Sequence, residues 1–281
     1  MEKAAKQVNQ VSRYRFTGSA SAPEGGARFG TAIAAPTDII RVSGIIKGMT
    51  ELSLNELKDA TIVFDLDGTL VDTAPDLTDA MNAVLASLGR PPAALDTVRH
   101  LVGLGARRLI AAGLDEAGAL PLDDVDMDAA LEDFLRHYEA NIAAQSQPFP
   151  GAETALAELD AAGARLAICT NKPERLARLL LDALDLSRYF RAIIGADTFA
   201  TKKPFAEPYL GAVARAGGAP GRSLMVGDSE TDVKTAAAAS RPVIVMSFGY
   251  SEKPASELGG DVVLNDYAAL PQTAAALLRR R

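Results

Sequence analysis

Histidine and cysteine are scarce in this chain of 281 residues, which has two histidines and one cysteine. A single thiol, Cys169, cannot form a disulfide within the chain, and a zinc site of the Cys/His type needs more ligands than are available. Lysine and arginine number 29 against 36 aspartates and glutamates, which gives a formal charge of −7. That balance does not favour a nucleic acid as partner, because proteins that bind its backbone are usually basic. No apolar run of about 18 residues is present, so the sequence predicts no transmembrane helix and no membrane partner.

The amino-terminal segment differs in charge from the rest of the chain. Residues 1–48 hold seven lysines and arginines against three acids, a charge of +4, so the other 233 residues carry −11. The segment has no sustained period of 2 or 3.6 residues, and we expect residues 1–56 to form a basic leader with little fixed structure. It lacks the apolar stretch of a secretory signal, and a transit segment is the weaker interpretation because no amphipathic helix is evident. Met49 is a second candidate start, which would make residues 1–48 an upstream extension, and we expect a cytoplasmic protein.

From Leu57 onward, short apolar runs alternate with helical patterns. Continuous apolarity within a short run is typical of a strand that is buried on both faces. The alternation predicts an α/β fold with a doubly wound parallel sheet and right-handed crossovers. The expected strands are Thr61–Phe64, Arg165–Cys169, Ala192–Ile194, Ser223–Val226, Val243–Met246 and Val262–Leu264. The expected helices between the later strands are Glu174–Leu184, Pro208–Ala216 and Thr231–Ala239.

One interval is too long for an ordinary crossover. The strand that ends at Phe64 and the strand that begins at Arg165 are separated by about 100 residues, whereas a crossover needs about a dozen or a little more. We therefore expect a catalytic core of residues 57–72 and 150–281, with an inserted all-helical cap of residues 73–149 over the ligand-binding edge of the sheet. The helical patterns of the insert are the apolar stripe Leu77, Met81, Val84, Leu85 and Leu88 and the segments Val98–Gly113 and Asp128–Ala144.

The first expected strand ends in the sequence Asp65-Leu-Asp67-Gly68-Thr69. Two carboxylates two residues apart at a strand end project from the same side of the chain, so they can meet one ligand. Like charges at this spacing favour protonation of one acid while a cation keeps the other ionised, which gives a nucleophile beside a proton donor. The alternative is an Asp-Gly turn with two solvated acids.

A second polar signature, Thr170-Asn171-Lys172-Pro173, follows the run that ends at Cys169. A hydroxyl followed by backbone amides at the start of a helix suits a phosphate oxygen, so Thr170 and Asn171 are candidate substrate-binding residues. The alternative is that one of these two side chains only caps the following helix. Cys169 itself is expected to be a small core residue and not a reactive thiol.

The third signature is the sequence Lys202-Lys203-Pro204, which precedes a helical pattern. A lysine held by a following proline can serve as a point charge on phosphate, which makes Lys203 a candidate phosphate-binding residue. The alternative is a pair of solvated surface lysines.

The fourth signature, Gly227-Asp228-Ser229-Glu230-Thr231-Asp232, again follows a strand directly. Asp228 and Asp232 are four residues apart across a strand-to-helix turn, so both can approach one centre. Carboxylate oxygens with little histidine or cysteine nearby suit Mg²⁺ better than zinc. Capping of the helix by Ser229 or Glu230 is the alternative. Together, the four signatures predict a nucleophile, a proton carrier, phosphate-binding groups and a Mg²⁺ site at successive ends of one sheet.

This order of motifs resembles the haloacid dehalogenase superfamily, and the resemblance covers about residues 57–281. The phosphatase branch of that superfamily carries a small helical cap after the first motif. The resemblance implies a Rossmann-like sheet of order 3-2-1-4-5 with Asp65 on the central strand, at the point where ligands bind in such sheets. The segments most similar to phosphoglycolate phosphatases are Asp72-Thr-Ala-Pro-Asp76, Val102-Gly-Leu-Gly105, Thr170-Asn-Lys-Pro and Phe248-Gly-Tyr250.

The resemblance also implies a role for each motif residue. Asp65 matches the nucleophile that forms an aspartyl-phosphate, and Asp67 matches the residue that protonates the leaving alkoxide and then activates water. Thr170 and Lys203 match phosphate-binding positions. The implied reaction is Mg²⁺-dependent hydrolysis of a small phosphorylated metabolite, with 2-phosphoglycolate first. The implied Mg²⁺ ligands are the Asp65 carboxylate, the Asp67 backbone carbonyl and Asp228, with Asp232 supporting them from behind or through water.

Substrate choice is expected to depend on the cap, in particular on the loop Val102–Arg107. Gly103 and Gly105 let the backbone approach a small ligand, and Arg107 or Arg108 would then pair with a substrate carboxylate. The alternative is that these arginines extend over the surface of a cap helix.

Two further questions stay open on the sequence. A sugar phosphomutase of the β-phosphoglucomutase type shares the four motifs and a helical cap, and a phosphatase for another sugar phosphate or for a nucleotide is also an alternative. A monomer and a homodimer are both compatible with the sequence.

Overall fold

The computed structural model describes residues 54–103, 105–117 and 125–279. The expectations for residues 1–53 lie outside the described residues. Leu54–Leu57 forms a 3₁₀ helix, η1, in which Leu57 is buried. The described fold therefore begins slightly before the predicted end of the leader at residue 56.

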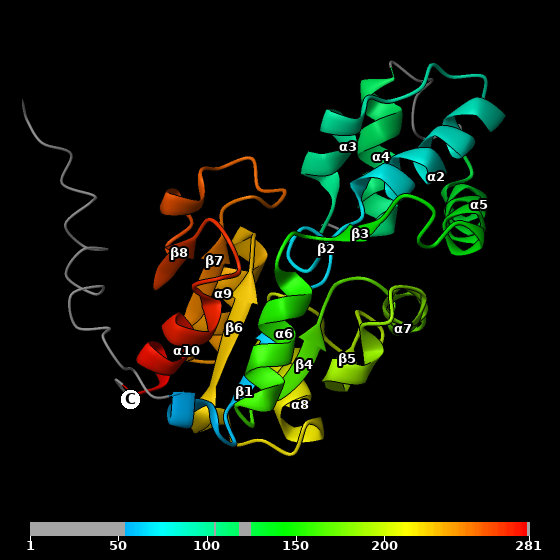
Figure 1. The fold of residues 1–281 in the computed structure, drawn as a ribbon. Helices are drawn as coiled ribbons and strands as arrows, with labels where there is room; N and C mark the ends of the chain where they lie inside the picture. Colours follow the sequence, from blue (N-terminus) through cyan, green and yellow to red (C-terminus); the bar gives the residue numbers. More distant parts are fainter. Residues whose placement is uncertain (1–53, 104, 118–124, 280–281) are drawn as a thin grey trace, which may run out of the picture. The chain divides into compact units, whose positions relative to one another are not determined.

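The centre of the fold is a six-stranded sheet. Its strands are β1 (Thr61–Phe64), β4 (Arg165–Cys169), β5 (Phe190–Ile194), β6 (Ser223–Gly227), β7 (Val243–Met246) and β8 (Val262–Leu264). They are parallel and lie in the order β5-β4-β1-β6-β7-β8, which confirms the predicted order 3-2-1-4-5 and adds β8 at the edge (Figure 1). Phe64 of β1 pairs with Ile168 of β4 and with Val226 of β6, so these strands end nearly level. Side chains that follow them therefore share one edge of the sheet.

Helices cover both faces of the sheet. On one face Ile62 and Phe64 of β1 pack in the same buried cluster as side chains of α6 (Ala152–Ala161), α7 (Glu174–Ala183) and α10 (Leu270–Arg279). On the other face Val63 packs in the same cluster as side chains of α8 (Ala206–Arg215) and α9 (Glu230–Ala238). Because successive side chains of β1 enter opposite cores, the strand is apolar from Ile62 to Phe64. The short 3₁₀ helices of this part are η3 (Ser187–Tyr189), η4 (Pro220–Arg222) and η5 (Ala255–Glu257).

A helical insert lies between β1 and β4. Its helices are α2 (Ala74–Ser87), α3 (Leu95–Leu101), α4 (Ala106–Glu116) and α5 (Met127–Ala140). Two short antiparallel strands, β2 (Val71–Asp72) and β3 (Gln147–Pro148), pair where the chain enters and leaves the insert. The insert has a hydrophobic cluster of its own, to which the core contributes Leu176 of α7. The division of the chain at residues 73 and 149 stays a prediction.

Two details of the insert differ from the predicted helices. The segment Val98–Gly113 forms two helices because the chain turns between α3 and α4, where Gly103 and Gly105 have φ angles of +90° and +94°. Such angles favour glycine and are incompatible with a continuing helix. Leu88, the last residue of the predicted apolar stripe, lies beyond the end of α2 and is 41% exposed.

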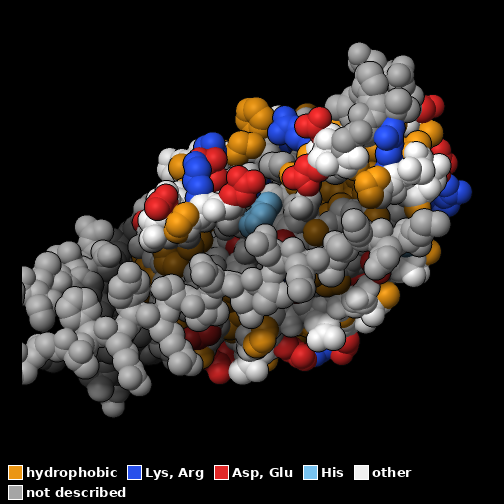
Figure 2. All heavy atoms as spheres, turned by 90° about the horizontal axis from the view of Figure 1, so that it is seen from above, with side chains coloured by type: hydrophobic (Ala, Val, Ile, Leu, Met, Phe, Trp, Pro, Cys, Tyr) orange, Lys and Arg blue, Asp and Glu red, His pale blue; other side chains and the backbone are white. Residues whose placement is uncertain are grey.

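The surface of the described residues carries charges of both signs. On the face drawn in Figure 2, lysine and arginine side chains are interspersed with aspartates and glutamates. Ion pairs such as Arg175–Glu139 and Lys253–Glu230 join different elements. Among the described helices, none combines the length and the apolarity that crossing a bilayer requires.

Candidate active site

Three buried aspartates meet at the carboxyl edge of the sheet. Asp65 follows β1, Asp228 follows β6, and Asp232 lies in the first turn of α9. One carboxylate oxygen of each lies within 4.8 Å of the others, and the three residues are only 6%, 3% and 0% exposed. The structure thus brings together acids that are up to 167 residues apart in the sequence.

Lys203 places an ammonium group among these acids. Its Nζ lies 2.8 Å from Asp65 Oδ1 and 2.7 Å from Asp232 Oδ1, and its side chain is 2% exposed. Burial acts to lower the pKa of Lys203, but the carboxylates of Asp232 and Asp65 outweigh it, so the net pKa is raised. The ammonium is therefore a fixed positive charge beside Asp65, as a phosphate-binding group requires.

Asp232 is held in place by the strand-to-helix turn. Its Oδ2 accepts hydrogen bonds from the backbone N–H groups of Asp228 (3.2 Å) and Ser229 (3.1 Å) and from Ser229 Oγ (2.7 Å). Ser229 in turn caps α9 by accepting from the Asp232 backbone N–H. A Cβ on Gly227 would lie 2.3 Å from Asp232 Cγ, so only glycine fits there. Asp232 therefore takes part both in the capping of α9 and in the acidic site, because its Oδ2 binds the turn and its Oδ1 binds Lys203.

Asp228 is fixed by two donors from other motifs. Its Oδ1 accepts from Thr69 Oγ1 at 2.7 Å, and its Oδ2 accepts from the Tyr250 backbone N–H at 2.8 Å. A Cβ on Gly249 would lie 2.2 Å from Asp228 Cβ, which explains the glycine before Tyr250. The first and last motifs are therefore joined through a single carboxylate.

Burial makes two of these carboxyl groups weak acids. Burial raises the pKa of Asp65 to about 6, with Asp232 and Asp67 adding to the shift and Lys203 opposing it. Burial, followed by the charges of Asp232 and Asp65, raises the pKa of Asp228 to about 8. Burial is the largest cause of both shifts, and repulsion between the clustered carboxylates adds to it. The donor set is oxygen only, which fits a hard divalent cation such as Mg²⁺.

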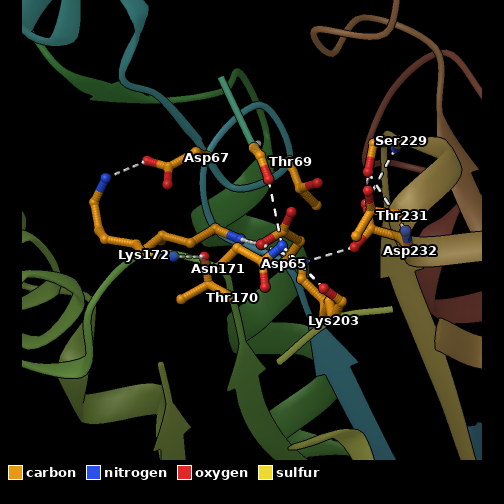
Figure 3. A network of polar contacts seen from close by, with 12 residues as sticks. Asp65, Asp67, Thr69, Thr170, Asn171, Lys172, Lys203, Ser229, Thr231 and Asp232 are labelled. Atoms are coloured by element: carbon orange, nitrogen blue, oxygen red, sulfur yellow. Dashed lines mark hydrogen bonds and ion pairs between the residues drawn. The ribbon is translucent and has the colours of Figure 1, made fainter. Parts of the chain in front are cut away.

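Asp67 points away from this cluster and toward Lys172 (Figure 3). Its Oδ1 accepts from Thr73 Oγ1 and from Lys172 Nζ, each at 2.7 Å. The side chains of Lys172 and Asp67 are 5% and 9% exposed. The expectation that Asp65 and Asp67 project alike fails because β1 ends at Phe64, beyond which strand alternation does not apply. Both aspartates nevertheless line the same cavity, so one ligand can reach both.

Thr170 and Asn171 lie at the end of β4. Thr170 is 3% exposed, and its Oγ1 accepts from the Lys172 backbone N–H at 3.2 Å. Asn171 Nδ2 donates to the backbone carbonyls of Gly103 and Lys203, each at 3.3 Å. Thr170 lines the cavity beside Asp65 and Asp67, while Asn171 connects the loop of the insert with the lysine motif.

Arg107 is not brought to the aspartates. It pairs with Asp128 on α5 at 2.5 Å, and the two side chains are 55% and 85% exposed. The cavity beside Asp65 and Asp67 has a volume of about 50 Å³, and Arg107 is outside its lining. The cation that does line it is Lys172.

Four residues at the site were not among the predicted site residues: Thr69, Tyr138, Lys172 and Tyr250. Thr69, Lys172 and Tyr250 belong to segments that the sequence analysis had singled out, so their motifs carried a signal. Tyr138 lies on α5, far along the chain, and no local pattern marks it. The packing of the insert against α7 brings it to Lys172, whose Nζ is 4.6 Å from the centre of its ring.

Known proteins are similar to this chain in sequence and in fold. A family model described as haloacid dehalogenase-like hydrolase matches residues 60–240. Phosphoglycolate phosphatase of Caulobacter vibrioides is 46% identical over 80% of this chain and 95% of its own. The enzyme of the same name from Agrobacterium fabrum is 48% identical over 74% of this chain and 89% of its own. A crystal structure of a predicted phosphoglycolate phosphatase from Haemophilus somnus superposes with a TM-score of 0.72 at 28% identity, over 79% of this chain and 99% of that one.

The region that the family model matches includes all four motifs and the insert, and the relatives from Caulobacter vibrioides and Agrobacterium fabrum are matched over 95% and 89% of their own length. The acids, the lysine and the hydroxyl described above lie in that region. The chain therefore belongs to the haloacid dehalogenase-like hydrolases and is a phosphoric monoester hydrolase.

Proposed function

We propose that the enzyme hydrolyses 2-phosphoglycolate to glycolate and phosphate, with Mg²⁺ and through an aspartyl-phosphate intermediate. The observation that carries the proposal is the buried group of Asp65, Asp228 and Asp232 around Lys203 at the carboxyl edge of the sheet. The names of the curated relatives support the substrate.

In the first half of the reaction, a carboxylate oxygen of Asp65 attacks phosphorus. The bond between phosphorus and the glycolate oxygen breaks, and the Asp67 carboxylic acid gives its proton to that oxygen. The Lys203 ammonium and the Thr170 hydroxyl hold the phosphoryl oxygens and offset their charge. Asp65 is then an acyl phosphate and Asp67 a carboxylate.

In the second half, water attacks the phosphorus of the acyl phosphate. The Asp67 carboxylate takes a proton from this water, and the bond between phosphorus and the Asp65 oxygen breaks. Phosphate leaves, and both aspartates return to their starting states. Asp67 can serve both halves because Thr73 and Lys172 hold it at the border of the cavity.

We place Mg²⁺ on the Asp65 carboxylate, the Asp67 backbone carbonyl and Asp228, with Asp232 as support. Three ionised aspartates and one ammonium carry a net charge of −2, so the site matches a divalent cation. Bound there, the cation would supply positive charge between a phosphate monoester and a carboxylate nucleophile that otherwise repel each other. Asp232 uses its oxygens for Lys203 and the turn, so its part is to hold the lysine and α9 in place.

The cavities beside Asp65 and Asp67 bear on the size of the leaving group. The cavity that Lys172 and Tyr138 line beside Asp65 and Asp67 has a volume of about 50 Å³, which suits a two-carbon leaving group. A second cavity of about 240 Å³ also contains Asp65 and Asp67 and extends to Asp228 and Tyr250. The substrate panel below therefore decides between 2-phosphoglycolate and the sugar phosphate and nucleotide alternatives.

The direct test is phosphate release from 2-phosphoglycolate by the purified full chain, with Mg²⁺ and with excess chelator. The proposal requires turnover that depends on Mg²⁺ and is lost in Asp65→Asn. The substrate panel should include sugar phosphates and nucleotides, and the products should be checked for isomerised sugar. Turnover of 2-phosphoglycolate in excess chelator, or net isomerisation without phosphate release, would overturn the proposal.

A further inference from the structure

Lys172 and Tyr138 form a buried polar pair whose only part in the chemistry described above is the contact by which Lys172 holds Asp67. Both line the cavity that also contains Asp65 and Asp67. Lys172 follows β4 in the core, whereas Tyr138 belongs to α5 of the insert. The pair therefore joins the core to the insert, and its Lys172 lies on the side of Asp67 that faces away from Lys203 (Figure 3).

The Lys172 ammonium has donors to offer a ligand. An ammonium carries three N–H donors, and Asp67 Oδ1 accepts one of them at 2.7 Å. The face of the Tyr138 ring is 4.6 Å from Nζ and provides a cation–π contact. Lys203, in contrast, is engaged by Asp65 and Asp232 on the phosphoryl side.

Tyr138 supplies an independent observation. The residue is 1% exposed, and its hydroxyl makes no hydrogen bond of standard geometry to a described residue, the Lys172 ammonium being the charge that acts on it most. Buried polar groups are nearly always paired, and a cavity-lining hydroxyl without a partner is therefore poised to bind a ligand. A hydroxyl and an ammonium side by side suit a carboxylate, which accepts hydrogen bonds at two oxygens.

The arrangement also has the right dimensions. The ester oxygen that leaves must meet Asp67, and Lys172 lies one hydrogen bond farther on. In 2-phosphoglycolate a single methylene separates the ester oxygen from the carboxylate. The carboxylate of a substrate bound for proton transfer from Asp67 therefore falls within reach of Lys172. The rest of this part of the cavity is apolar, with Val102, Leu109, Phe134 and Leu135 among its lining.

We propose that Lys172 and Tyr138 form a carboxylate subsite that selects phosphomonoesters whose leaving group carries a carboxylate next to the ester oxygen. This inference rests on the proposed function and assigns to Lys172 the recognition that the sequence had suggested for Arg107. The competing role for Lys172 is purely that of a positioning residue, which holds Asp67 for proton transfer and has no contact with substrate.

Binding of unreactive phosphonates separates the two roles. In 3-phosphonopropionate a methylene replaces the ester oxygen of 2-phosphoglycolate, and propylphosphonate is the matching compound without a carboxylate. Neither compound takes a proton from Asp67, so their inhibition constants report recognition alone. These constants should be measured against Mg²⁺-dependent phosphate release from ethyl phosphate for the wild type, Lys172→Met and Tyr138→Phe. Arg107→Gln tests the rival cation, and Lys234→Met on the exposed surface of α9 is the control.

We expect 3-phosphonopropionate to inhibit the wild type at least about 10-fold more strongly than propylphosphonate. Lys172→Met should lower the ratio of the two inhibition constants by roughly 10- to 100-fold, because a hydrogen bond to a charged group contributes about that factor to binding. Tyr138→Phe should lower the same ratio by about 3- to 10-fold. Arg107→Gln and Lys234→Met should retain it.

Several results would overturn the inference. One is that Lys172→Met weakens both phosphonates equally, or changes neither constant while lowering kcat, because Lys172 would then only position Asp67. Another is loss of the preference in Arg107→Gln and not in Lys172→Met. A wild type that hydrolyses ethyl phosphate but not 2-phosphoglycolate would refute the proposed function as well, so the two failures are distinguishable.

Discussion

Replacement of Lys203 by methionine tests the electrostatic account of the site. The ammonium lies within 2.8 Å of carboxylate oxygens of Asp65 and Asp232, and its side chain is 2% exposed. Methionine retains much of the apolar stem and removes the charge, so the main consequence is three clustered carboxylates without a cation. Removing one partner of a buried ion pair costs about 3–5 kcal/mol of folding free energy.

The loss of stability should depend on pH, and the wild type already indicates the direction. The pKa values of Asp65 (about 6) and Asp228 (about 8) lie above the ordinary value of 3.8. The protonated acids therefore stabilise the metal-free fold most fully below pH 4, and this contribution is lost as the pH rises through 6 and 8. Without Lys203 the pKa of Asp65 rises further, because the charge that opposes the shift is absent. We expect a deficit of about 3–5 kcal/mol at pH 8 and roughly half of that at pH 5.

Urea unfolding of the wild type and Lys203→Met, in excess chelator at pH 5 and pH 8, measures this difference. Lys202→Met is the matched control, because Lys202 is an exposed neighbour in the same segment. Mg²⁺ should narrow the deficit at pH 8 by supplying positive charge. The variant should also lose about 100- to 1000-fold in kcat, the scale of losing one transition-state donor. A deficit equal at the two pH values, or as large in the control, would refute the electrostatic account.

Three further outcomes are expected. Asp65→Asn should lose essentially all phosphate release while its circular dichroism and urea midpoint stay close to those of the wild type, and substantial residual turnover would contradict the nucleophile assignment. The rise in Tm on adding Mg²⁺ should grow from pH 5 to pH 8, because Asp65 and Asp228, with pKa values of about 6 and about 8, must lose protons to bind the cation; a constant rise would argue against these ligands. Asp76→Ala should lower the free energy of unfolding by about 3 kcal/mol in urea, because the buried Asp76 carboxylate accepts hydrogen bonds from Gln145 and Ser146, where the chain leaves the insert. The control Asp79→Ala, at an exposed position of the same helix, should leave the urea midpoint nearly unchanged.

The strands of the sheet could be predicted because burial on both faces determines the residue types within each short run of sequence. A strand such as β1 is apolar at nearly every position when both faces are covered, and the run Ile62–Phe64 shows this in consecutive residues. The helices α7, α8 and α9 began and ended within two residues of the predicted limits. The insert was less predictable, because its break between α3 and α4 depends on backbone angles at Gly103 and Gly105 and not on a change in hydrophobic pattern.

The residues of the site also differ in how well the sequence predicts them. Groups that follow strand ends, such as Asp65, Thr170 and Asp228, could be identified because parallel strands that end level place their next residues together. Contacts that depend on how the insert packs could not be identified. The pairing of Arg107 with Asp128 and the approach of Tyr138 to Lys172 each join residues whose separation in sequence carries no periodic signal.

Asp65 and Asp67 each have a lysine, and this pairing explains how two acids so close in sequence can take different chemical parts. Asp65 shares the buried Lys203 with Asp232 and lies among like charges, so its carboxylate is the one that gains most from a bound cation. Asp67 has Lys172 and the Thr73 hydroxyl on one oxygen. If Lys172 also binds the leaving group, the ammonium lies between the two negative charges that proton transfer would otherwise bring together, the Asp67 carboxylate and the substrate carboxylate. Substrate recognition and placement of the proton carrier then depend on one charge. A substrate without the carboxylate would be bound more weakly, although the same acid would serve its chemistry.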